Sequence, residues 1–530
     1  MKRFLSIFTC LALLLSMGAI FAACDEKDEP AATTTTAATT VSSGERDEDL
    51  DNSSKKPSKK PATTTYVPSM PSDPSEFEEI EFSVPNINWG GEECYIIGRS
   101  DYAAPQFKNL EIWSDGTRSD PIDAAVWERN QFLHTKFNFR VRQHLTNSVK
   151  EEMAAVFGSG VDLYDICLYS PIDAAKHAEY GYLLDLSTVE HIDLDHPSWD
   201  QNVTKQLSIG NKVYFTSNDF LLQDKDRIEI IYYNRDMARQ ANKGYLEDKV
   251  TSGDWTVEYF ASLVKEFSKD GNSNQQLGDY RADGSGDYFG LGLSSYDSFV
   301  SFAYGAGVKL SYLDENGTLV INNDSTNIKE ITDLLGTFLF DKTQSLYVND
   351  LTPVDYKAHC QLFSCGKQMF CADALSSLDR IHEGEPMRDM ISFDYSFLPH
   401  PKYEAGMDTW YASTPSGSTG SVIAIPCTAN EPGKSGFFVQ SLAEASTYST
   451  LFTFYAHKAN INGALDLRAF EMLDIVFTSV RYDFASMYDM AKLFTMLSSF
   501  AKLKTSNFKT LEQRYEAAVT AAQDLMNKFA

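Results

Sequence analysis

Basic residues are scarce in this sequence, and the short motifs of the common enzyme classes are missing. The 46 lysine and arginine residues are outnumbered by 74 aspartate and glutamate residues, which gives a formal net charge of −28. Nucleic acid is bound by basic patches, so a chain this acidic is not expected to bind it. No H-E-x-x-H, G-x-S-x-G or P-loop motif is present. We therefore predict neither a nucleic-acid-binding protein nor an enzyme of these classes.

Long hydrophobic runs are also missing, except for one at the N-terminus. Lys2 and Arg3 precede an uncharged, almost entirely apolar stretch at residues 5–20, and Phe21-Ala22-Ala23-Cys24 follows it. This is the layout of a secretory signal, and we predict a signal peptide over residues 1–23. A transmembrane helix needs roughly 20 apolar residues, and this stretch is short for that role. No later segment is long enough to span a membrane.

The end of this signal resembles a bacterial lipobox, although Phe21 stands where the motif usually has leucine. The resemblance implies cleavage before Cys24 and lipidation of its thiol. A lipid anchor would then be the only attachment of the chain to a membrane. An ordinary signal peptide that is cut elsewhere is the alternative.

Large apolar residues are almost absent from residues 24–80. This segment consists mainly of threonine, alanine, serine, proline and charged residues. Such a composition cannot bury enough surface to offset the entropy of the chain. We predict a disordered stalk with a coil dimension on the order of 40 Å.

From residue 92 onward, strand and helix patterns alternate. Residues 94–98 predict a buried strand, residues 123–137 carry apolar side chains at helical spacing, and residues 164–168 predict another strand. Further along, residues 213–215 and 228–233 predict strands, and Thr256 begins a helix that continues to residue 267. Strands that alternate with single helices predict an α/β fold with parallel sheets. The length is sufficient for two lobes, each with its own core.

Several of these segments, taken in order, resemble the extracellular solute-binding proteins of family 1. These are the sugar-type receptors of ABC transporters, which include maltose-binding protein. The segments that carry the resemblance are Ala125-Val126-Trp127-Glu128-Arg129-Asn130, Tyr182-Leu183-Leu184-Asp185-Leu186-Ser187, Gly210-Asn211-Lys212-Val213-Tyr214-Phe215, Ile231-Tyr232-Tyr233-Asn234-Arg235-Asp236-Met237, Gly253-Asp254-Trp255-Thr256 and Ser421-Val422-Ile423-Ala424-Ile425-Pro426.

The resemblance implies a two-lobe, periplasmic-binding-protein-like fold of type II, with lobes joined by several hinge crossovers. Lobe one would comprise residues 92–213 and 374–413, and lobe two residues 214–373 and 414–530. The implied function is that of a monomeric, lipid-anchored receptor on the extracellular face of a bacterial cytoplasmic membrane. It would capture a small solute, expected to be a mono- or oligosaccharide, and deliver it to the permease subunits of an ABC transporter.

Candidate ligand-binding residues follow from where such folds bind solutes. In open parallel sheets, ligands bind beyond the carboxyl ends of the strands, and a sugar is held by carboxylates, amides and aromatic rings. Each candidate can instead be a surface charge or a packed aromatic ring, which is the role expected for Trp127 and Trp255. The candidates at strand ends and crossovers are Asp101, Tyr102, Trp113, Asn218, Asp219, Tyr296, Asp297, Asp373, Arg380, Trp410 and Tyr411.

The cysteine spacing does not match a usual metal site. Cys360, Cys365 and Cys371 are separated by four and five residues, whereas zinc sites favour closer pairs with two further ligands. A disulfide within this group is an alternative for an exported chain. We predict no metal and no cofactor.

Residues 279–290 are similar to a calcium loop but lack two of its ligands. Arg281 occupies the third ligand position, and Gly290 replaces the closing glutamate. A glycine-rich turn is therefore expected here. We predict no catalytic residue, and the alternatives left open are an exported carbohydrate-active enzyme and a surface adhesin that binds polysaccharide.

Overall fold

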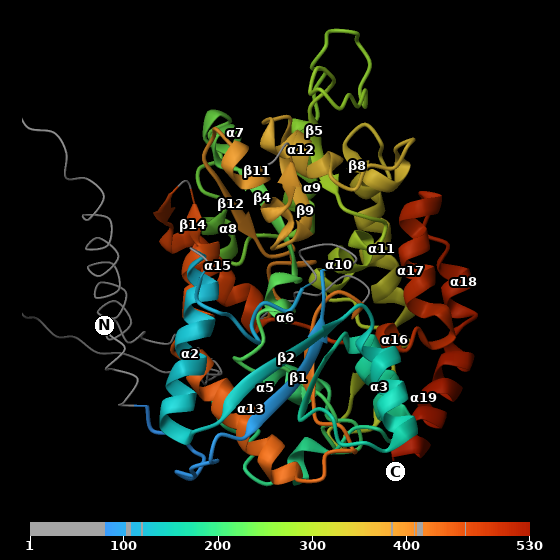
Figure 1. Cartoon of the computed structure of the whole chain (residues 1–530). Coiled ribbons are helices and arrows are strands. Elements are labelled where there is room, and N and C mark those ends of the chain that lie inside the picture. Colours follow the sequence, from blue (N-terminus) through green and yellow to red (C-terminus); the bar gives the residue numbers. More distant parts are fainter. Residues whose placement is uncertain are drawn as a thin grey trace, which may run out of the picture. The chain divides into compact units, whose positions relative to one another are not determined.

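The computed structural model describes residues 80–101, 108–117, 120–382, 385–407, 409–410, 417–461 and 463–529. All of them belong to one unit, residues 73–530. Two larger sheets form its framework, one of four strands in the order β13-β3-β1-β2 and one of five in the order β12-β4-β9-β5-β8. β1 and β2 lie in the lower half of the view in Figure 1, and β4, β9 and β12 lie in the upper half. We call the two halves lobe one and lobe two.

The sheet of lobe one is mostly parallel. β1 (Glu93–Arg99), β2 (Arg140–Thr146) and β3 (Ile166–Tyr169) run in one direction, and β13 (Val422–Ala424) pairs with β3 in the opposite direction. Single helices connect the parallel strands, as the alternating pattern predicts. The helices of this part of the chain are α2 (Pro121–Phe137), α3 (Val149–Ser159), α4 (Pro171–Glu179) and α5 (Gln201–Gln206).

The sheet of lobe two is mixed. β5 (Phe289–Leu293) is parallel to β8 (Ser345–Tyr347) and β9 (Gln368–Ala374), whereas β4 (Glu229–Asn234) is antiparallel to β9 and to β12 (Tyr395–Leu398). Every residue of these five strands is buried, because helices and loops cover both faces. The helix α6 (Gln223–Asp226) precedes β4, and the helices between these strands are α7 (Arg235–Gln240), α8 (Glu247–Thr251), α9 (Val257–Phe267), α10 (Ser298–Gly305), α11 (Ser325–Leu339) and α12 (Ala358–Ser364).

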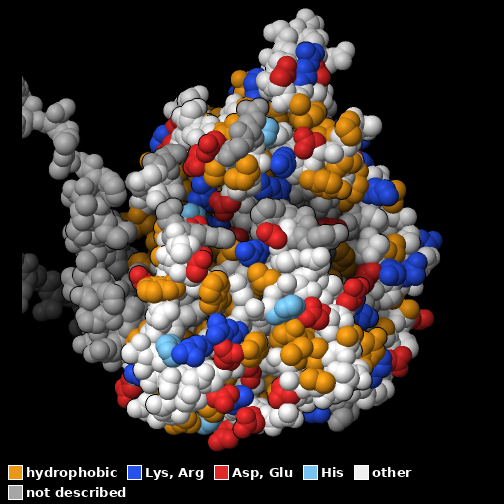
Figure 2. Space-filling model, in the orientation of Figure 1, with side chains coloured by type: hydrophobic (Ala, Val, Ile, Leu, Met, Phe, Trp, Pro, Cys, Tyr) orange, Lys and Arg blue, Asp and Glu red, His pale blue; other side chains and the backbone are white. Residues whose placement is uncertain are grey.

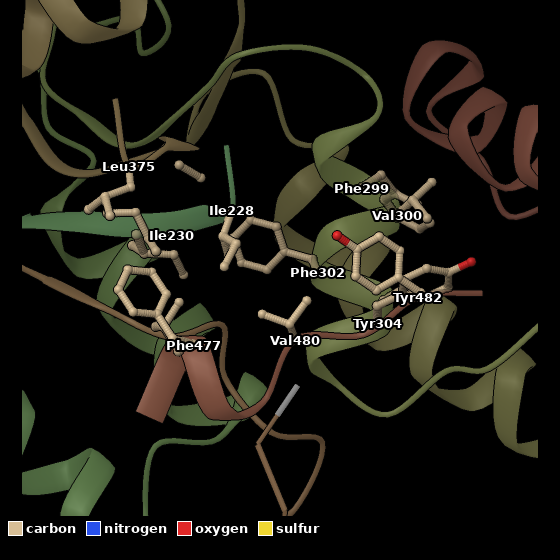
Figure 3. Close-up of a cluster of buried hydrophobic side chains, with 14 of the residues drawn as sticks. Ile228, Ile230, Phe299, Val300, Phe302, Tyr304, Leu375, Phe477, Val480 and Tyr482 are labelled. Atoms are coloured by element: carbon tan, nitrogen blue, oxygen red, sulfur yellow. The ribbon is translucent and has the colours of Figure 1, made fainter. Parts of the chain in front are cut away.

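The C-terminal part is helical, and its helices pack on both lobes. Phe437 and Phe438 of α13 pack with Cys94 and Ile96 of β1, whereas α15 contacts β12. Figure 3 shows Phe477 and Val480 close to core side chains of lobe two. The helices of this part are α13 (Pro432–Thr447), α14 (Thr450–Lys458), α15 (Leu467–Thr478), α16 (Phe484–Met487), α17 (Leu493–Leu503), α18 (Phe508–Glu512) and α19 (Tyr515–Phe529). Small hairpins form from β6 (Ser311–Leu313) with β7 (Leu319–Ile321), β10 (Ile381–His382) with β11 (Glu385–Pro386), and β14 (Asn460–Ile461) with β15 (Ala464–Leu465).

Two strands correct the predicted division into lobes. The sequence placed residues 374–413 in lobe one, but β12 pairs with β4 and so belongs to the sheet of lobe two. It placed residues 414–530 in lobe two, but β13 pairs with β3 of lobe one. The chain therefore stays in lobe two after β9 and crosses back between β12 and β13. Short apolar strands look alike in sequence, and only their hydrogen-bond partners decide which sheet they join. The remaining boundaries, for residues 92–213 and 214–373, stay predictions.

The returning strand touches the outgoing segment. Ile423 N donates to Thr216 O at 2.8 Å, and Thr216 N donates to Ile423 O at 3.2 Å. The crossing that leaves lobe one and the crossing that returns to it therefore lie side by side. Paired connections of this kind are where two lobes can bend relative to one another.

Candidate ligand-binding site

The carboxyl edge of lobe one carries short polar side chains. Ser100 and Asp101 follow β1, Asn147 follows β2 and Ser170 follows β3, so the parallel strands present them at one edge. Ser100 Oγ donates to Asn147 Oδ1 at 2.7 Å, and Asp101 is exposed. Hydroxyl, amide and carboxylate groups at one edge can hydrogen-bond a polyhydroxylated ligand.

Arg99, the last residue of β1, holds the neighbouring backbone in place. Its guanidinium donates to the carbonyl oxygens of Ser418 and Thr419, each at 3.3 Å, and of Gly420 at 2.7 Å. These carbonyls belong to the segment that enters β13. Burial lowers the pKa of Arg99, but the guanidinium stays charged at neutral pH. Arg99 was not among the predicted site residues, although its position at the end of the first strand, close to Asp101, indicates that it lies at this edge.

Two predicted residues lie together at the carboxyl edge of lobe two. Tyr296 and Asp297 follow β5, and Asp350 follows β8 beside it. Tyr296 OH donates to Asp350 Oδ1 at 2.6 Å, and Ser498 Oγ donates to Asp297 Oδ1 at 2.7 Å. Burial, aided by the bond to Asp350, raises the pKa of Tyr296 to about 12. The phenol is therefore a hydrogen-bond donor at neutral pH.

A lysine from a distant helix completes this group. Lys504, one residue beyond α17, places its Nζ 2.9 Å from Asp350 Oδ2 and 4.1 Å from the ring centroid of Tyr347. Burial alone would raise the pKa of Asp350, but the hydrogen bonds from Tyr296 and Lys504 outweigh it and the pKa is lowered. Neither Asp350 nor Lys504 was predicted, because their partners are far away in the sequence.

Asp373 and Arg380 form a buried ion pair. Asp373, near the end of β9, has its Oδ2 2.9 Å from Arg380 Nη2 and 2.8 Å from His359 Nε2. Burial alone would raise the pKa of this carboxyl, but Arg380 and His359 hold it well below its usual range. The structure thus brings the two predicted residues, Asp373 and Arg380, together, but they pair with each other.

Asn218 and Asp219 lie in a turn on the outgoing crossing. Asn218 is fully buried, and its Oδ1 accepts from Phe220 N at 3.2 Å. Asp219 Oδ2 accepts a hydrogen bond from Thr447 Oγ1, in the last turn of α13. Burial raises the pKa of Asp219 to about 7, although the charge of Lys225 opposes the rise. The turn thus ties the crossing to the helix that packs on lobe one.

Asp219 should make the stability of the protein depend on pH. A carboxyl whose pKa is about 7 in the folded state and about 3.9 in the unfolded chain favours folding below pH 4 and loses this contribution as the pH rises through 7. Asp219→Asn has no such proton to lose. We expect the unfolding free energy of the wild type, relative to the variant, to fall by about 2 kcal/mol between pH 4 and pH 8, half of what the full shift allows. Urea unfolding of both proteins across this pH range measures the difference. If the unfolding free energies of the two proteins change with pH in the same way, the raised pKa of Asp219 is wrong.

The tryptophans differ in their surroundings. Trp410 is partly buried, with Lys402 Nζ 4.3 Å from its ring centroid. Trp113 is 40% exposed, and so is Trp127, for which packing was predicted. Trp255 is buried and donates from Nε1 to Pro399 O at 2.9 Å, which confirms its predicted packing role.

Three predicted residues lie outside the described part of the chain. These are Tyr102, Tyr411 and the proposed lipidation site Cys24. In the described part, no helix is both long and apolar enough to cross a membrane.

The loop at residues 279–290 uses its carboxylates to hold a turn. Asp287 accepts from the backbone nitrogens of Gly271 at 3.0 Å and Asp279 at 2.9 Å. Asp283 Oδ1 accepts from Ser285 N at 2.9 Å. These bonds are those of the turn that was expected from the sequence.

No family model matches the chain, and no curated protein matches it in sequence. Solved structures do match. A galacto-N-biose/lacto-N-biose I-binding protein of an ABC transporter from Bifidobacterium longum has a TM-score of 0.51 at 10% identity, over 83% of this chain and 98% of that one. A sugar transporter from Rhizobium etli in an open conformation has a TM-score of 0.53 at 14% identity, over 81% and 99%. RafE from Streptococcus pneumoniae has a TM-score of 0.50 at 14% sequence identity, over 83% of this chain and 100% of that one.

These likenesses establish the fold. The chain has the mixed α/β, two-lobe fold of type II periplasmic binding proteins, as predicted from the sequence. On the face shown in Figure 2, acidic and basic side chains are interspersed over the described surface.

Proposed function

We propose that this chain is the substrate-binding component of an ABC importer and captures a carbohydrate between its two lobes. The observation that carries the proposal is the fold itself, in which two sheets each present a carboxyl edge lined with polar side chains. Ligands of open sheets bind at such edges. The similar structures include a lacto-N-biose complex and a protein described as a sugar transporter, which supports a sugar as the solute.

Closure of the lobes would couple capture to transport. The outgoing segment is paired with β13 through Thr216 and Ile423 in lobe one, so the connections between the lobes begin close to each other, and bending in them can bring the two edges together around a ligand. A permease that contacts both lobes can then distinguish the loaded receptor from the empty one. We further propose that the receptor is a monomer, anchored at the extracellular face of the membrane through a lipid on Cys24 and raised from it by the stalk at residues 24–80.

A binding role fits the carboxylates of lobe two better than a catalytic one. Asp297 and Asp350 each accept a hydrogen bond from a neighbouring side chain of the protein. A glycosidase needs a pair of carboxyl groups aimed at the same bond of the substrate. The fixed carboxylates at this edge are more suitable for recognition than for proton transfer.

A thermal-shift screen against mono- and oligosaccharides tests the proposal. A ligand that binds only the folded protein adds about 2.7 kcal/mol of stability at 100 times its dissociation constant. We expect the melting temperature to rise with one class of sugar and to stay constant with amino acids and peptides. If no sugar shifts the melting temperature and a peptide or amino acid does, the carbohydrate assignment is wrong.

A further inference from the structure

Three metal-ligating side chains meet in the core of lobe two, beneath its carboxyl edge, and an aspartate lies beside them. His359 and Cys360 come from α12, and Cys371 and Asp373 come from β9. Cys371 and Asp373 are two residues apart on a strand and therefore point to the same face of the sheet. That face is the one on which α12 packs. All four side chains are buried, with Asp373 the most exposed at 3%.

The distances between the ligand atoms are close to those of a tetrahedral metal site. Cys360 Sγ lies 3.4 Å from His359 Nε2, 3.9 Å from Cys371 Sγ and 4.0 Å from Asp373 Oδ2. The ligand atoms of His359, Cys360 and Cys371 all lie within 4.8 Å of one another. With zinc bonds of about 2.0–2.3 Å, neighbouring ligand atoms of a tetrahedron are about 3.3–3.8 Å apart. The contact of 2.8 Å between His359 Nε2 and Asp373 Oδ2 is the one that must open.

We propose that this cluster is a structural zinc site. Two sulfurs, one imidazole nitrogen and one carboxylate oxygen form a ligand set that suits zinc and is too soft for magnesium or calcium. His359, Cys360 and Cys371 supply three ligands, and Asp373, whose Oδ2 lies 4.0 Å from Cys360 Sγ, would shift to supply the fourth and complete the tetrahedral shell of a structural site. When the ion binds, the two thiols lose their protons to solvent, and His359 also gives up the proton on Nε2 that it donates to Asp373.

Opposite charges would surround the ion. Two thiolates and the Asp373 carboxylate carry three negative charges, and the positive charges that face them are Zn²⁺, the Arg380 guanidinium and the buried Arg227 guanidinium. Arg380 Nη2 lies 2.9 Å from Asp373 Oδ2, so it can orient the carboxylate as an outer partner of the metal site. A buried group of charges is tolerated when opposite charges are paired and hydrogen-bonded.

A disulfide explains less of the arrangement. A disulfide requires its sulfur atoms about 2.05 Å apart, whereas those of Cys360 and Cys371 are 3.9 Å apart. A disulfide would also not explain why His359 Nε2 and Asp373 Oδ2 both lie near Cys360 Sγ. The site could not be predicted from the cysteine spacing. Cys365, the middle cysteine, is exposed and is not a ligand, and the remaining ligands are a histidine and an aspartate. The proposal thus departs from the sequence prediction that no metal is bound.

Zinc content measures the site directly. The full chain is purified under reducing conditions, incubated with zinc, freed of excess metal by gel filtration and analysed by mass spectrometry of the elements. We expect about one zinc ion per chain in the wild type and in Cys365→Ser, which removes the exposed cysteine of the same segment. We expect at least a tenfold lower content in Cys371→Ser and Cys360→Ser. Added zinc should raise the melting temperature of the wild type and of Cys365→Ser only.

Cobalt provides a second measurement that needs no variant to fold. Co²⁺ bound to the reduced wild-type chain should give a thiolate-to-cobalt charge-transfer band and the intense visible bands of tetrahedral coordination. Alkylating the thiols beforehand in unfolded protein should remove both. The proposal is overturned if the reduced chain binds no metal, if Cys371→Ser retains zinc as the wild type does, or if cobalt gives only octahedral bands.

A stable disulfide would also overturn the proposal. It would appear as a Cys360–Cys371 peptide in digests of the protein purified without reductant, together with an absence of zinc from the reduced form. The result does not depend on sugar binding, so failure here leaves the proposed transport function untouched.

Discussion

Arg235→Met should destabilise the protein by about 3–5 kcal/mol, because it leaves the buried Glu247 carboxylate without its cation. Arg235 is 3% exposed and lies at the start of α7. Its Nε donates to Glu247 Oε1 at 3.0 Å, and its Nη1 lies 3.4 Å from Asp394 Oδ1 and also bonds Asp466 Oδ2. Glu247 is 1% exposed, so its charge has little access to water once the arginine is lost.

The same helix offers a matched control. Arg239, one turn further along α7, pairs with Asp236 and with Asp394, but its side chain is 42% exposed. Exposed pairs contribute about 0–1 kcal/mol, so Arg239→Met should cost no more than that. Urea unfolding of both variants measures the difference. If the two variants lose the same free energy of unfolding, burial does not explain the contribution of Arg235 to stability.

Trp410→Ala should weaken the binding of the cognate sugar at least tenfold, which corresponds to about 1.4 kcal/mol. This rests on the proposed function. The indole is held by Lys402, whose buried Nζ also donates to Met407 O at 2.7 Å. A ring fixed in this way can stack on the apolar face of a sugar without first losing conformational freedom.

Two further variants separate stacking from loss of structure. Trp410→Phe keeps an aromatic ring and should retain more affinity than Trp410→Ala, as measured by titration calorimetry. Trp127→Ala removes an exposed tryptophan from α2 of lobe one and should leave the affinity unchanged. If Trp410→Ala binds a sugar that stabilises the wild type with undiminished affinity, Trp410 is not part of the site.

The sequence predicted elements with strong local signals well. The helix expected at residues 123–137 is α2, which begins at Pro121 because Asp120 caps it by accepting from Ile122 N at 2.8 Å. Thr256 caps α9 as predicted, with Oγ1 accepting from Tyr259 N at 3.3 Å. Such caps depend on residues within one turn of the chain, so the sequence contains all the information that they require.

Features that depend on distant partners were not predictable in this way. Residues 213–215 look like a strand, but no strand forms there, and the next residue, Thr216, makes an isolated bridge to Ile423. Lys504 and Asp350 are separated by more than a hundred residues, and neither is unusual in its local sequence. The assignment of β12 and β13 failed for the same reason, because the pairing of a short strand is decided by the sheet that has a free edge.

The late arrival of β13 affects the order in which the protein can fold. β1, β2 and β3 are synthesised early, yet the edge of β3 stays unpaired until Val422–Ala424 have been made, after all five strands of the other sheet. Long-range pairing of this kind slows folding, since a large loop must close before the contact forms. A nascent chain would therefore expose an unprotected β3 edge while residues 170–421 are synthesised, and such edges favour aggregation. The early half of the molecule would then depend on chaperones until the last residues of the sheet emerge.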